Sequence, residues 1–463
     1  MELTKYSLVE MGSLIRRREI SPVELVEAHL KRIEDLNWKL NAIVTLAPDV
    51  IDQARQAQAI RDSSFRPLLG VPVTIKDTIA TAGIRTTSGS RVRQDFVPKL
   101  DAPAVARLRA AGAIILGKTN TPEMAIPYET DNPVFGRTNN PYDVRLTPGG
   151  SSGGEAAAIA ACLSPGGVGS DLSGSIRVPA HFCGIVGLKP SSDRIPITGH
   201  VPIAYGPIAQ AACLGPMART VADVSLLFRV LAAIEPAPGI TAEELKGSRV
   251  FWYDDDGVAP VSQDVKLAIK EAVRSLNEVG MQCINRRPSA VESGPRLWIR
   301  LFAKTSARDL SEFYAGAENL AGPLVRRVLD AAKPADQPSM GELEQALEER
   351  SRFRQELLSM MDDTPVMIAP VSATAAFPHN TNRIDVDGAS VSAFRAFSYS
   401  QTYNVFDLPA VVVPAGQTAS GLPVGVQIVG KPFGEDLILA VAAIIESALG
   451  GWRPPSNAEA DPI

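Results

Sequence analysis

The stretch PGGSSGGEAAAIAA, residues 148–161, places a glycine-rich turn directly before an alanine-rich helix. Its four glycines surround two serines, so the backbone can approach a ligand closely and aim its amides at negative charge. Upstream, an apolar run at 70–75, a helical pattern at 102–111 and a second apolar run at 113–116 alternate as strand, helix and strand. This alternation predicts an α/β layered fold.

The two ends of the chain fit the same architecture. A serine followed by a proline opens an amphipathic helix predicted over 21–40. Two apolar runs, at 410–413 and 424–429, predict buried strands, and 435–449 predicts a closing helix.

Residues 285–360 differ from the rest of the chain because they are charged and largely helical, with a proline-containing break at 334–339. We expect a variable helical insertion there. No proline-, serine- or glycine-rich linker is long enough to mark a domain boundary. Residues 1–463 are therefore expected to form one domain.

The composition excludes several classes of function. The net charge is −5 and the charges are interspersed, so there is no basic stripe suited to a nucleic-acid backbone. No apolar run reaches the roughly 20 residues of a membrane span, and the N-terminus lacks a secretory-signal pattern, so we expect a cytoplasmic protein. Cysteine and histidine spacing matches no metal site, and neither a metal nor a cofactor is expected.

A second serine-rich turn, GSDLSGSIR at 169–177, follows the first by about the length of one helix, a turn and a return. Lys76 and Asp77 stand where the apolar run at 70–75 ends, and strand ends often carry chemistry. Taken singly, a glycine-rich turn also fits a linker or a phosphate cradle. Lys76 alone also fits a surface ion pair with Asp77.

Together these blocks resemble the amidase signature family, which combines a lysine at a strand end, a GGSSGG serine and a nucleophilic serine in a D-x-G-G-S-I-R type of loop. Further similar segments are GKTNTPEMA at 117–125, HFCGIVGLKP at 181–190, LPAVVVPAG at 408–416 and GLPVGVQIVG at 421–430.

The resemblance implies that Ser175 attacks the carbonyl carbon, Ser151 relays its proton and Lys76 acts as base. A lysine ordinarily has a pKa near 10.4, so Lys76 must be buried to be neutral. The resemblance also implies an α/β domain whose central mixed sheet is covered by helices on both faces, and a cis peptide at Gly150–Ser151. The expected oxyanion hole consists of the amides of Leu172, Ser173, Gly174 and Ser175.

The same resemblance implies roles for other residues. Ser173 stands where the family commonly has glycine, which leaves the shape of the loop and of the acyl pocket open. Arg177 is expected to pair with Asp171 and hold the loop. The segment after GKTNTPE runs along the substrate cleft in the family, so the expected substrate contacts are Met124, Ala125, Ile126 and Tyr128, with plain core packing as the alternative.

Two competing functions share parts of these motifs. Residues 112–119, GAIILGKT, match a phosphate-binding pattern, but the four residues between the glycines read as a strand, so nucleotide binding is not expected. A glutaminase subunit of a tRNA-dependent amidotransferase would carry the same triad. Such subunits usually have tyrosine-glycine-arginine where this chain has SSDR at 191–194, and threonine-glycine where it has Phe406-Asp407.

We therefore favour a free-standing amidase, a monomer or homodimer, that acts on small or aryl amides, with esters and carbamates as further candidates. The DLSGSIR variant and the chain length are similar to those of family members that hydrolyse urethanes.

Overall fold

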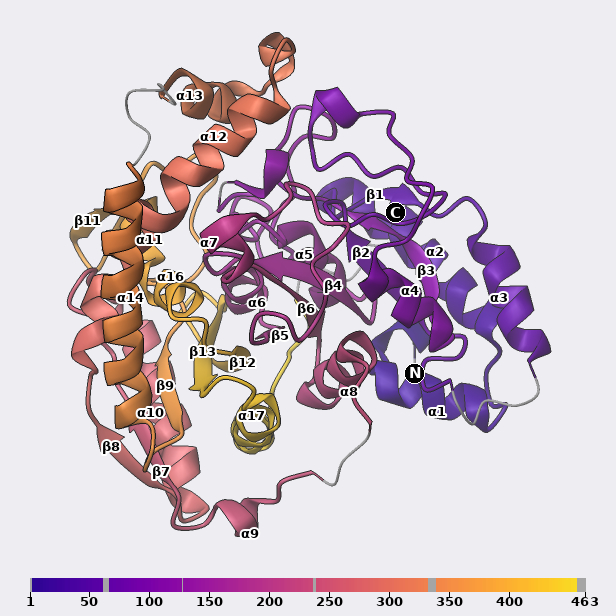
Figure 1. Ribbon diagram of the computed structural model, residues 1–463. Helices are drawn as coiled ribbons and strands as arrows, with labels where there is room; N and C mark the ends of the chain where they lie inside the picture. Colours follow the sequence, from indigo (N-terminus) through magenta and orange to yellow (C-terminus); the bar gives the residue numbers. More distant parts are fainter. Residues whose placement is uncertain (1, 61–65, 127, 236–238, 332–338, 456–463) are drawn as a thin grey trace.

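The computed structural model describes residues 2–60, 66–126, 128–235, 239–331 and 339–455 (Figure 1). Within them, one mixed sheet has the strand order β1-β3-β2-β4-β6-β5-β12-β13-β9-β7-β8. Helices flank this sheet, so the predicted single α/β domain is confirmed.

The sheet pairs both parallel and antiparallel strands. The pairs β2/β3, β2/β4, β7/β8 and β7/β9 are parallel, and the remaining neighbours are antiparallel. The strands are β1 (Ile43–Leu46), β2 (Pro72–Lys76), β3 (Ile114–Thr119), β4 (Gly166–Asp171), β5 (Val186–Lys189), β6 (Cys213–Ala218), β7 (Arg249–Trp252), β8 (Gln282–Asn285), β9 (Val366–Pro370), β12 (Ala410–Gln417) and β13 (Pro423–Gly430). A separate hairpin joins β10 (Arg383–Val386) and β11 (Ala389–Ser392).

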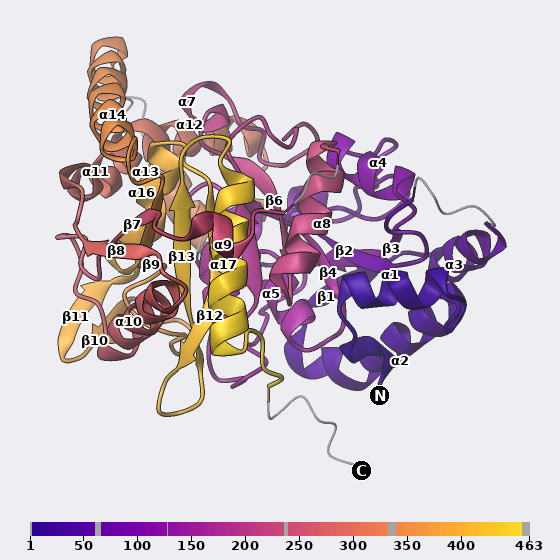
Figure 2. The ribbon, with the colours of Figure 1, turned by 90° about the horizontal axis from the view of Figure 1, so that it is seen from below.

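Each face of the sheet has its own helices. One face is covered by α4 (Pro103–Ala110), α8 (Val221–Ala232), α10 (Gln263–Glu278) and α17 (Glu435–Leu449). Figure 2 shows α8 and α17 in front of the strands. The opposite face carries α5 (Gly153–Ala160), α6 (Arg177–Phe182) and α16 (Ser398–Val405). The central strands are therefore buried on both sides, which explains their continuous apolar runs.

The N-terminal helices pack near the β1 edge and against α8. They are α1 (Leu8–Arg16), α2 (Pro22–Leu40) and α3 (Val50–Ala59). Ser21 caps α2 in a capping box with Glu24, as the predicted helix start required. The predicted bounds of α17 are also confirmed. The shorter elements are η1 (Leu3–Lys5), η2 (Arg91–Arg93), η3 (Glu123–Ala125), α7 (Gly206–Ala209), α9 (Ala242–Leu245) and α15 (Ala393–Ala396).

The segment GAIILGKT forms no phosphate loop, because most of it belongs to β3, which runs to Thr119 and is longer than predicted. The Lys118 side chain is buried, and its Nζ donates to the carbonyl of Ile79 and, at 2.8 Å, to the hydroxyl of Thr81.

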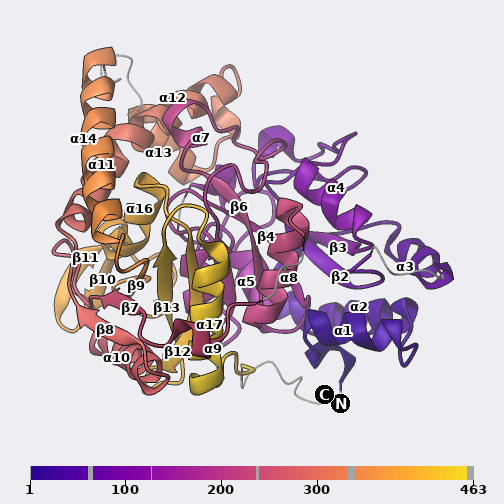
Figure 3. The same ribbon diagram turned by 60° about the horizontal axis from the view of Figure 1, so that its bottom comes forward.

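Residues 289–331 form a group of helices that we call the helical wall. Together with α14, they gather at one corner of the molecule (Figure 3). The wall contains η4 (Ser289–Ser293), α11 (Gly294–Trp298), the π-helical η5 (Ile299–Ala303), α12 (Lys304–Phe313), η6 (Glu318–Leu320) and α13 (Pro323–Ala331), and α14 spans Met340–Met360. The predicted helical character is present in the described residues of 285–360, and the variability of the region stays a prediction. The break predicted at 334–339 lies outside the described residues except for Ser339. Among the described residues, no helix combines the length and apolar character needed to cross a bilayer.

Candidate active site

Lys76 is the last residue of β2, and its side chain is fully buried. Its Nζ lies 2.6 Å from Ser151 Oγ, 3.0 Å from Ser152 Oγ and 3.0 Å from Ser170 Oγ. Burial lowers the pKa of Lys76 to about 7, although two nearby carboxylates act in the opposite direction. An amine with this pKa is available as a proton acceptor at neutral and alkaline pH.

Asp77 does not form the surface ion pair considered as an alternative for Lys76. Its side chain is buried and accepts hydrogen bonds from the amide and the hydroxyl of Thr87. Lys76 therefore faces the serine hydroxyls.

Ser151 lies in the glycine-rich turn that leads into α5, and the Gly150–Ser151 peptide is cis, as expected. The turn packs closely against the chain at Asn120, because a Cβ on Gly154 would lie 2.4 Å from the Asn120 backbone. Glycine is required at such a close approach. The shape of the turn thus depends on backbone packing as well as on its serines.

Ser175 follows β4, and its side chain reaches the same cavity as Ser151. The amide of Ser152 donates to the Ser175 carbonyl at 3.0 Å, which ties the two serine turns together. Within the described residues, no hydrogen bond joins the Ser151 and Ser175 hydroxyls. The structure therefore brings the three predicted catalytic residues to one place, and their roles stay a prediction.

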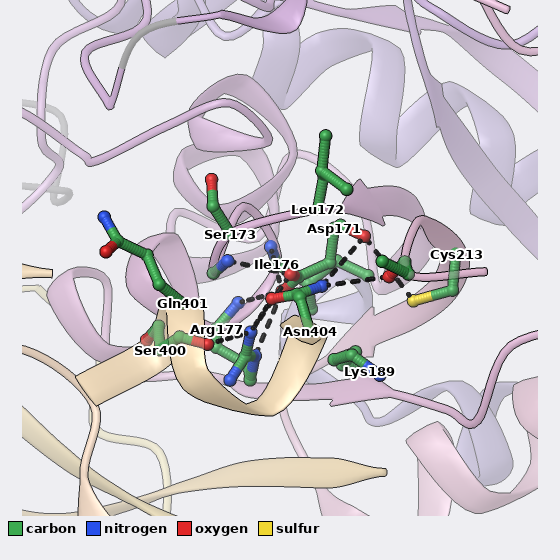
Figure 4. A network of polar contacts seen from close by, with 12 residues as sticks. Asp171, Leu172, Ser173, Ile176, Arg177, Lys189, Cys213, Ser400, Gln401 and Asn404 are labelled. Atoms are coloured by element: carbon green, nitrogen blue, oxygen red, sulfur yellow. Dashed lines mark hydrogen bonds and ion pairs between the residues drawn. The ribbon is translucent and has the colours of Figure 1, made fainter. Parts of the chain in front are cut away.

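The loop before Ser175 is held by a buried ion pair between Asp171 and Arg177, as expected (Figure 4). The Asp171 carboxylate also accepts from the amides of Gly174 at 2.8 Å and Ile176 at 3.1 Å. Burial would raise the pKa of Asp171, but the Arg177 guanidinium holds it well below its usual range. An ionised carboxylate thus fixes the loop by accepting hydrogen bonds from two of its amides.

Arg177 extends this network to the C-terminal part of the chain. Its guanidinium donates to the Ser400 carbonyl at 2.8 Å, to Asn404 Oδ1 at 2.5 Å and to Gln427 Oε1 at 2.9 Å. Figure 4 shows Ser400 and Asn404 reaching it from α16.

The backbone amides of the loop divide into two groups. The Gly174 amide, predicted for the oxyanion hole, is occupied by Asp171. In the part of the chain that the structure describes, the amides of Leu172, Ser173 and Ser175 have no protein acceptor. Gly174 has φ +107°, and a Cβ there would lie 2.5 Å from Ser400 Cβ, so glycine is required at 174.

Two side chains hold the carbonyls of this loop from outside. Trp298 Nε1 donates to the Leu172 carbonyl at 3.2 Å, and the Tyr128 hydroxyl donates to the Ser173 carbonyl at 3.2 Å. Carbonyl and N–H point in opposite directions across a trans peptide. Trp298 therefore also fixes the direction of the Ser173 amide.

The two serines open into a cavity of about 290 Å³ with a mainly apolar lining. Met124, Ala125 and Ile126 line it, as predicted for substrate contacts. Tyr128 is not among its lining residues, because its hydroxyl is engaged behind the loop with Ser173 and Gln401.

Sequence reasoning missed the rest of the lining. The missed residues lie in two segments, 197–213 and the helical wall, and include Ile197, His200, Ile203, Ile208, Cys213, Trp298, Ala303, Ala307, Leu310 and Val328. The spacing of 303, 307 and 310 on one helical face was an available signal, but it does not reveal what the face covers. Ser152 and Ser170, which contact Lys76, lie within the two serine-rich turns.

Comparisons with known proteins give relatives that match nearly the whole chain. The family model described as Amidase matches residues 24–439. Human fatty-acid amide hydrolase 2 is 33% identical over 97% of this chain and 90% of its own length. A glutamyl-tRNA(Gln) amidotransferase subunit from Roseiflexus castenholzii is 34% identical over 95% of each chain. The structure of 6-aminohexanoate cyclic dimer hydrolase with its substrate superposes with a TM-score of 0.86, at 28% identity, over 99% of this chain and 100% of the other.

Proposed function

Because this chain belongs to the amidase signature family of amide hydrolases, we propose that it cleaves small and aryl amides through an ester formed on Ser175. One observation carries the proposal: a buried lysine with a pKa of about 7 lies 2.6 Å from the Ser151 hydroxyl. Burial makes Lys76 a base, and the short contact gives it one defined proton donor.

In the proposed reaction, Ser175 Oγ attacks the amide carbon and passes its proton to Ser151, whose own proton moves to neutral Lys76. The developing oxyanion accepts hydrogen bonds from the amides of Leu172, Ser173 and Ser175. When the carbon–nitrogen bond breaks, the proton returns through Ser151 to the leaving amine. Water then attacks the Ser175 ester by the same relay, which releases the acid and restores the free serine.

The lining of the cavity supports uncharged substrates. The two carboxylates that line it, Asp171 and Asp309, are paired with Arg177 and Arg308. No lysine or arginine of the described residues lines the cavity. A substrate that carries a free carboxylate would therefore lack a partner, whereas an aryl or alkyl group would contact apolar side chains.

Aryl carbamates extend the same proposal. Their carbonyl carbon has the same geometry, and attack by Ser175 would release the alcohol or the amine first. Hydrolysis of the ester that remains on Ser175 would then give a carbonic acid monoester or a carbamic acid, and either product loses CO₂. We therefore expect the same residues to hydrolyse urethanes, without any additional catalytic group.

A second candidate is the glutaminase component of an amidotransferase, which the 34% identity to the Roseiflexus castenholzii protein favours. The two segments that depart from the pattern of such proteins contact each other here, since the Ser192 amide donates to Asp407 Oδ1 at 2.9 Å. Residues 191–194 and Phe406-Asp407 thus differ from that pattern at one place in the structure. This difference supports the free-standing amidase.

The test compares kcat/KM for an anilide, its carbamate analogue and free glutamine with the purified protein. We expect the anilide and the carbamate to be turned over and glutamine to be the poorest of the three. Ser175→Ala should lose all turnover while its circular dichroism and melting temperature stay close to those of the wild type, which excludes a contaminating hydrolase. Glutamine as the best substrate would replace the proposal with the glutaminase.

A further inference from the structure

His200 lines the same cavity as Ser151 and Ser175, yet the proposed reaction gives it no role. The residue follows β5 in the segment that lines the cavity, and its backbone forms an isolated bridge with Ile79, three residues beyond Lys76. Its imidazole Nδ1 lies 2.9 Å from the Pro202 carbonyl, and its Nε2 lies 3.0 Å from Ser170 Oγ. Ser170 in turn lies 3.0 Å from Lys76 Nζ. A chain of three hydrogen bonds therefore links Pro202, His200, Ser170 and the proposed base.

The donors and acceptors of this chain can be assigned one by one. A carbonyl oxygen only accepts, so the His200 hydrogen is on Nδ1 and is donated to Pro202. In a neutral imidazole, Nε2 is then a bare acceptor. Ser170 must therefore donate its single hydroxyl hydrogen to His200 Nε2. It follows that Ser170 can interact with Lys76 only by accepting an N–H.

Ser152 is assigned in the same way. Its hydroxyl donates to the Ser170 carbonyl at 3.3 Å, so towards Lys76, 3.0 Å away, it can act only as an acceptor. A neutral amine has two N–H groups and one free electron pair. Both N–H groups of Lys76 are thus committed, to Ser152 and to Ser170. The electron pair is left for the third contact, the Ser151 hydroxyl at 2.6 Å.

We propose that His200 is a positioning residue that acts through Ser170 to direct the free electron pair of Lys76 at the Ser151 hydroxyl. The inference rests on the proposed function, because only a reaction that uses Lys76 as a base needs its electron pair aimed. His200 itself touches none of the atoms that react. Its contribution is to keep the Ser170 hydrogen turned away from Lys76.

The charge state of His200 supports this arrangement. Loss of solvation around the ring, with the charge of Lys76 nearby, lowers the pKa of His200 to about 4. The imidazole is therefore neutral where Lys76 is active. A protonated ring would donate to Ser170 and free the serine hydrogen to compete with Ser151 for the Lys76 electron pair.

The first experiment replaces the imidazole with side chains that do or do not accept at the position of Nε2. His200→Phe keeps a ring but no acceptor, so we expect kcat for the anilide to fall on the order of tenfold to hundredfold, as when the orienting partner of a base is lost. His200→Gln offers an amide oxygen to Ser170 and should recover most of that loss. His379→Phe is the matched control, because neither ring nitrogen of His379 makes a hydrogen bond in the described part of the chain.

The second experiment is a double-mutant cycle with Ser170→Ala, which removes the hydroxyl through which His200 acts. If the proposal holds, His200→Phe has little effect in the Ser170→Ala background, because no serine hydrogen remains to be misdirected. Packing alone would give additive losses and no recovery by glutamine, and either result overturns the proposal. Melting temperatures measured on every variant separate a loss of folding from a loss of kcat.

The two proposals fail in different ways. If Ser175→Ala retains turnover, the ester mechanism itself is wrong. If Ser175→Ala and Lys76→Ala are inactive but the His200 and Ser170 losses add, the ester mechanism stands and only the positioning role of His200 is lost.

Discussion

The cavity has two sides that are built differently. Its floor, which consists of the end of β2 and residues 148–177, lies within the sheet and its covering helices, and three serine hydroxyls contact its Lys76. The helical wall lies outside the sheet and reaches the cavity with the apolar residues Ala303, Ala307, Leu310 and Val328. We infer that the floor fixes the chemistry through hydrogen bonds, whereas the wall selects substrates by shape.

The largest expected effect tests the floor. Lys76→Ala and Ser151→Ala should each lower kcat for the anilide by about a thousandfold or more. Because a proton relay fails as a unit, the kcat of the double variant should equal that of the less active single variant. The measurement is steady-state and single-turnover kinetics on all three variants. Losses that multiply in the double variant would mean that the two residues act independently.

The pH dependence of the wild type tests the same residue without a substitution. Since the pKa of Lys76 is lowered to about 7 and the neutral amine is the proposed base, kcat/KM should rise with pH through 7 and level off above it. Below the pKa, the rate should fall about tenfold per pH unit. A profile with its maximum near pH 5 would exclude lysine as the base.

A smaller effect is expected where the wall contacts the floor. Trp298→Phe keeps an aromatic ring in the cavity but removes the N–H that holds the Leu172 carbonyl, so kcat should fall by about tenfold, less than for direct loss of an oxyanion donor. Trp452→Phe is the control, because the Trp452 indole N–H is buried without a partner among the described residues. Equal kcat values for Trp298→Phe and Trp452→Phe would show that the hydrogen bond from Trp298 to the Leu172 carbonyl does not affect the reaction.

The smallest effect should come from the wall itself. Val328→Ala enlarges the cavity by two methyl groups, so the ratio of kcat/KM between a bulky and a small anilide should rise by a few-fold to about tenfold, with little change for the small substrate. Val230→Ala, the same change in α8, serves as the control because Val230 does not line the cavity. A uniform loss for both substrates would show that the wall supports the chemistry as well as the selection.

Much of the floor could be predicted from the sequence, because its residues sit in two short glycine- and serine-rich motifs next to a recognisable strand end. The strand β4 was missed, since glycines at 166, 167 and 169 are typical of turns. The structure gives the reason for them. A Cβ on Gly167 would lie 2.2 Å from Glu155 Oε1, so the strand can pass the buried glutamate of α5 only without a side chain.

The wall and His200 could not be predicted for a different reason. The wall helices show amphipathic patterns that any packed helix would show, and what they cover is decided by tertiary packing. His200 is a lone histidine, and its contact with Ser170 joins positions 30 residues apart in sequence. The amide of Gly174 was assigned to the oxyanion hole because the motif includes it, whereas the geometry of Asp171 decides otherwise.

The chain is synthesised from its N-terminus, so the partners of Arg177 are made at different times. Lys76, Ser151 and Ser175 all leave the ribosome well before Ser400, Asn404 and Gln427, the residues that complete the coordination of Arg177. Until those residues are made, the Arg177 guanidinium can pair with Asp171 but lacks its acceptors at Ser400, Asn404 and Gln427. A prematurely terminated chain would contain Lys76, Ser151 and Ser175 without the contacts that join the loop of Ser175 to the C-terminal part of the chain. We therefore expect hydrolytic activity only when the chain is nearly complete.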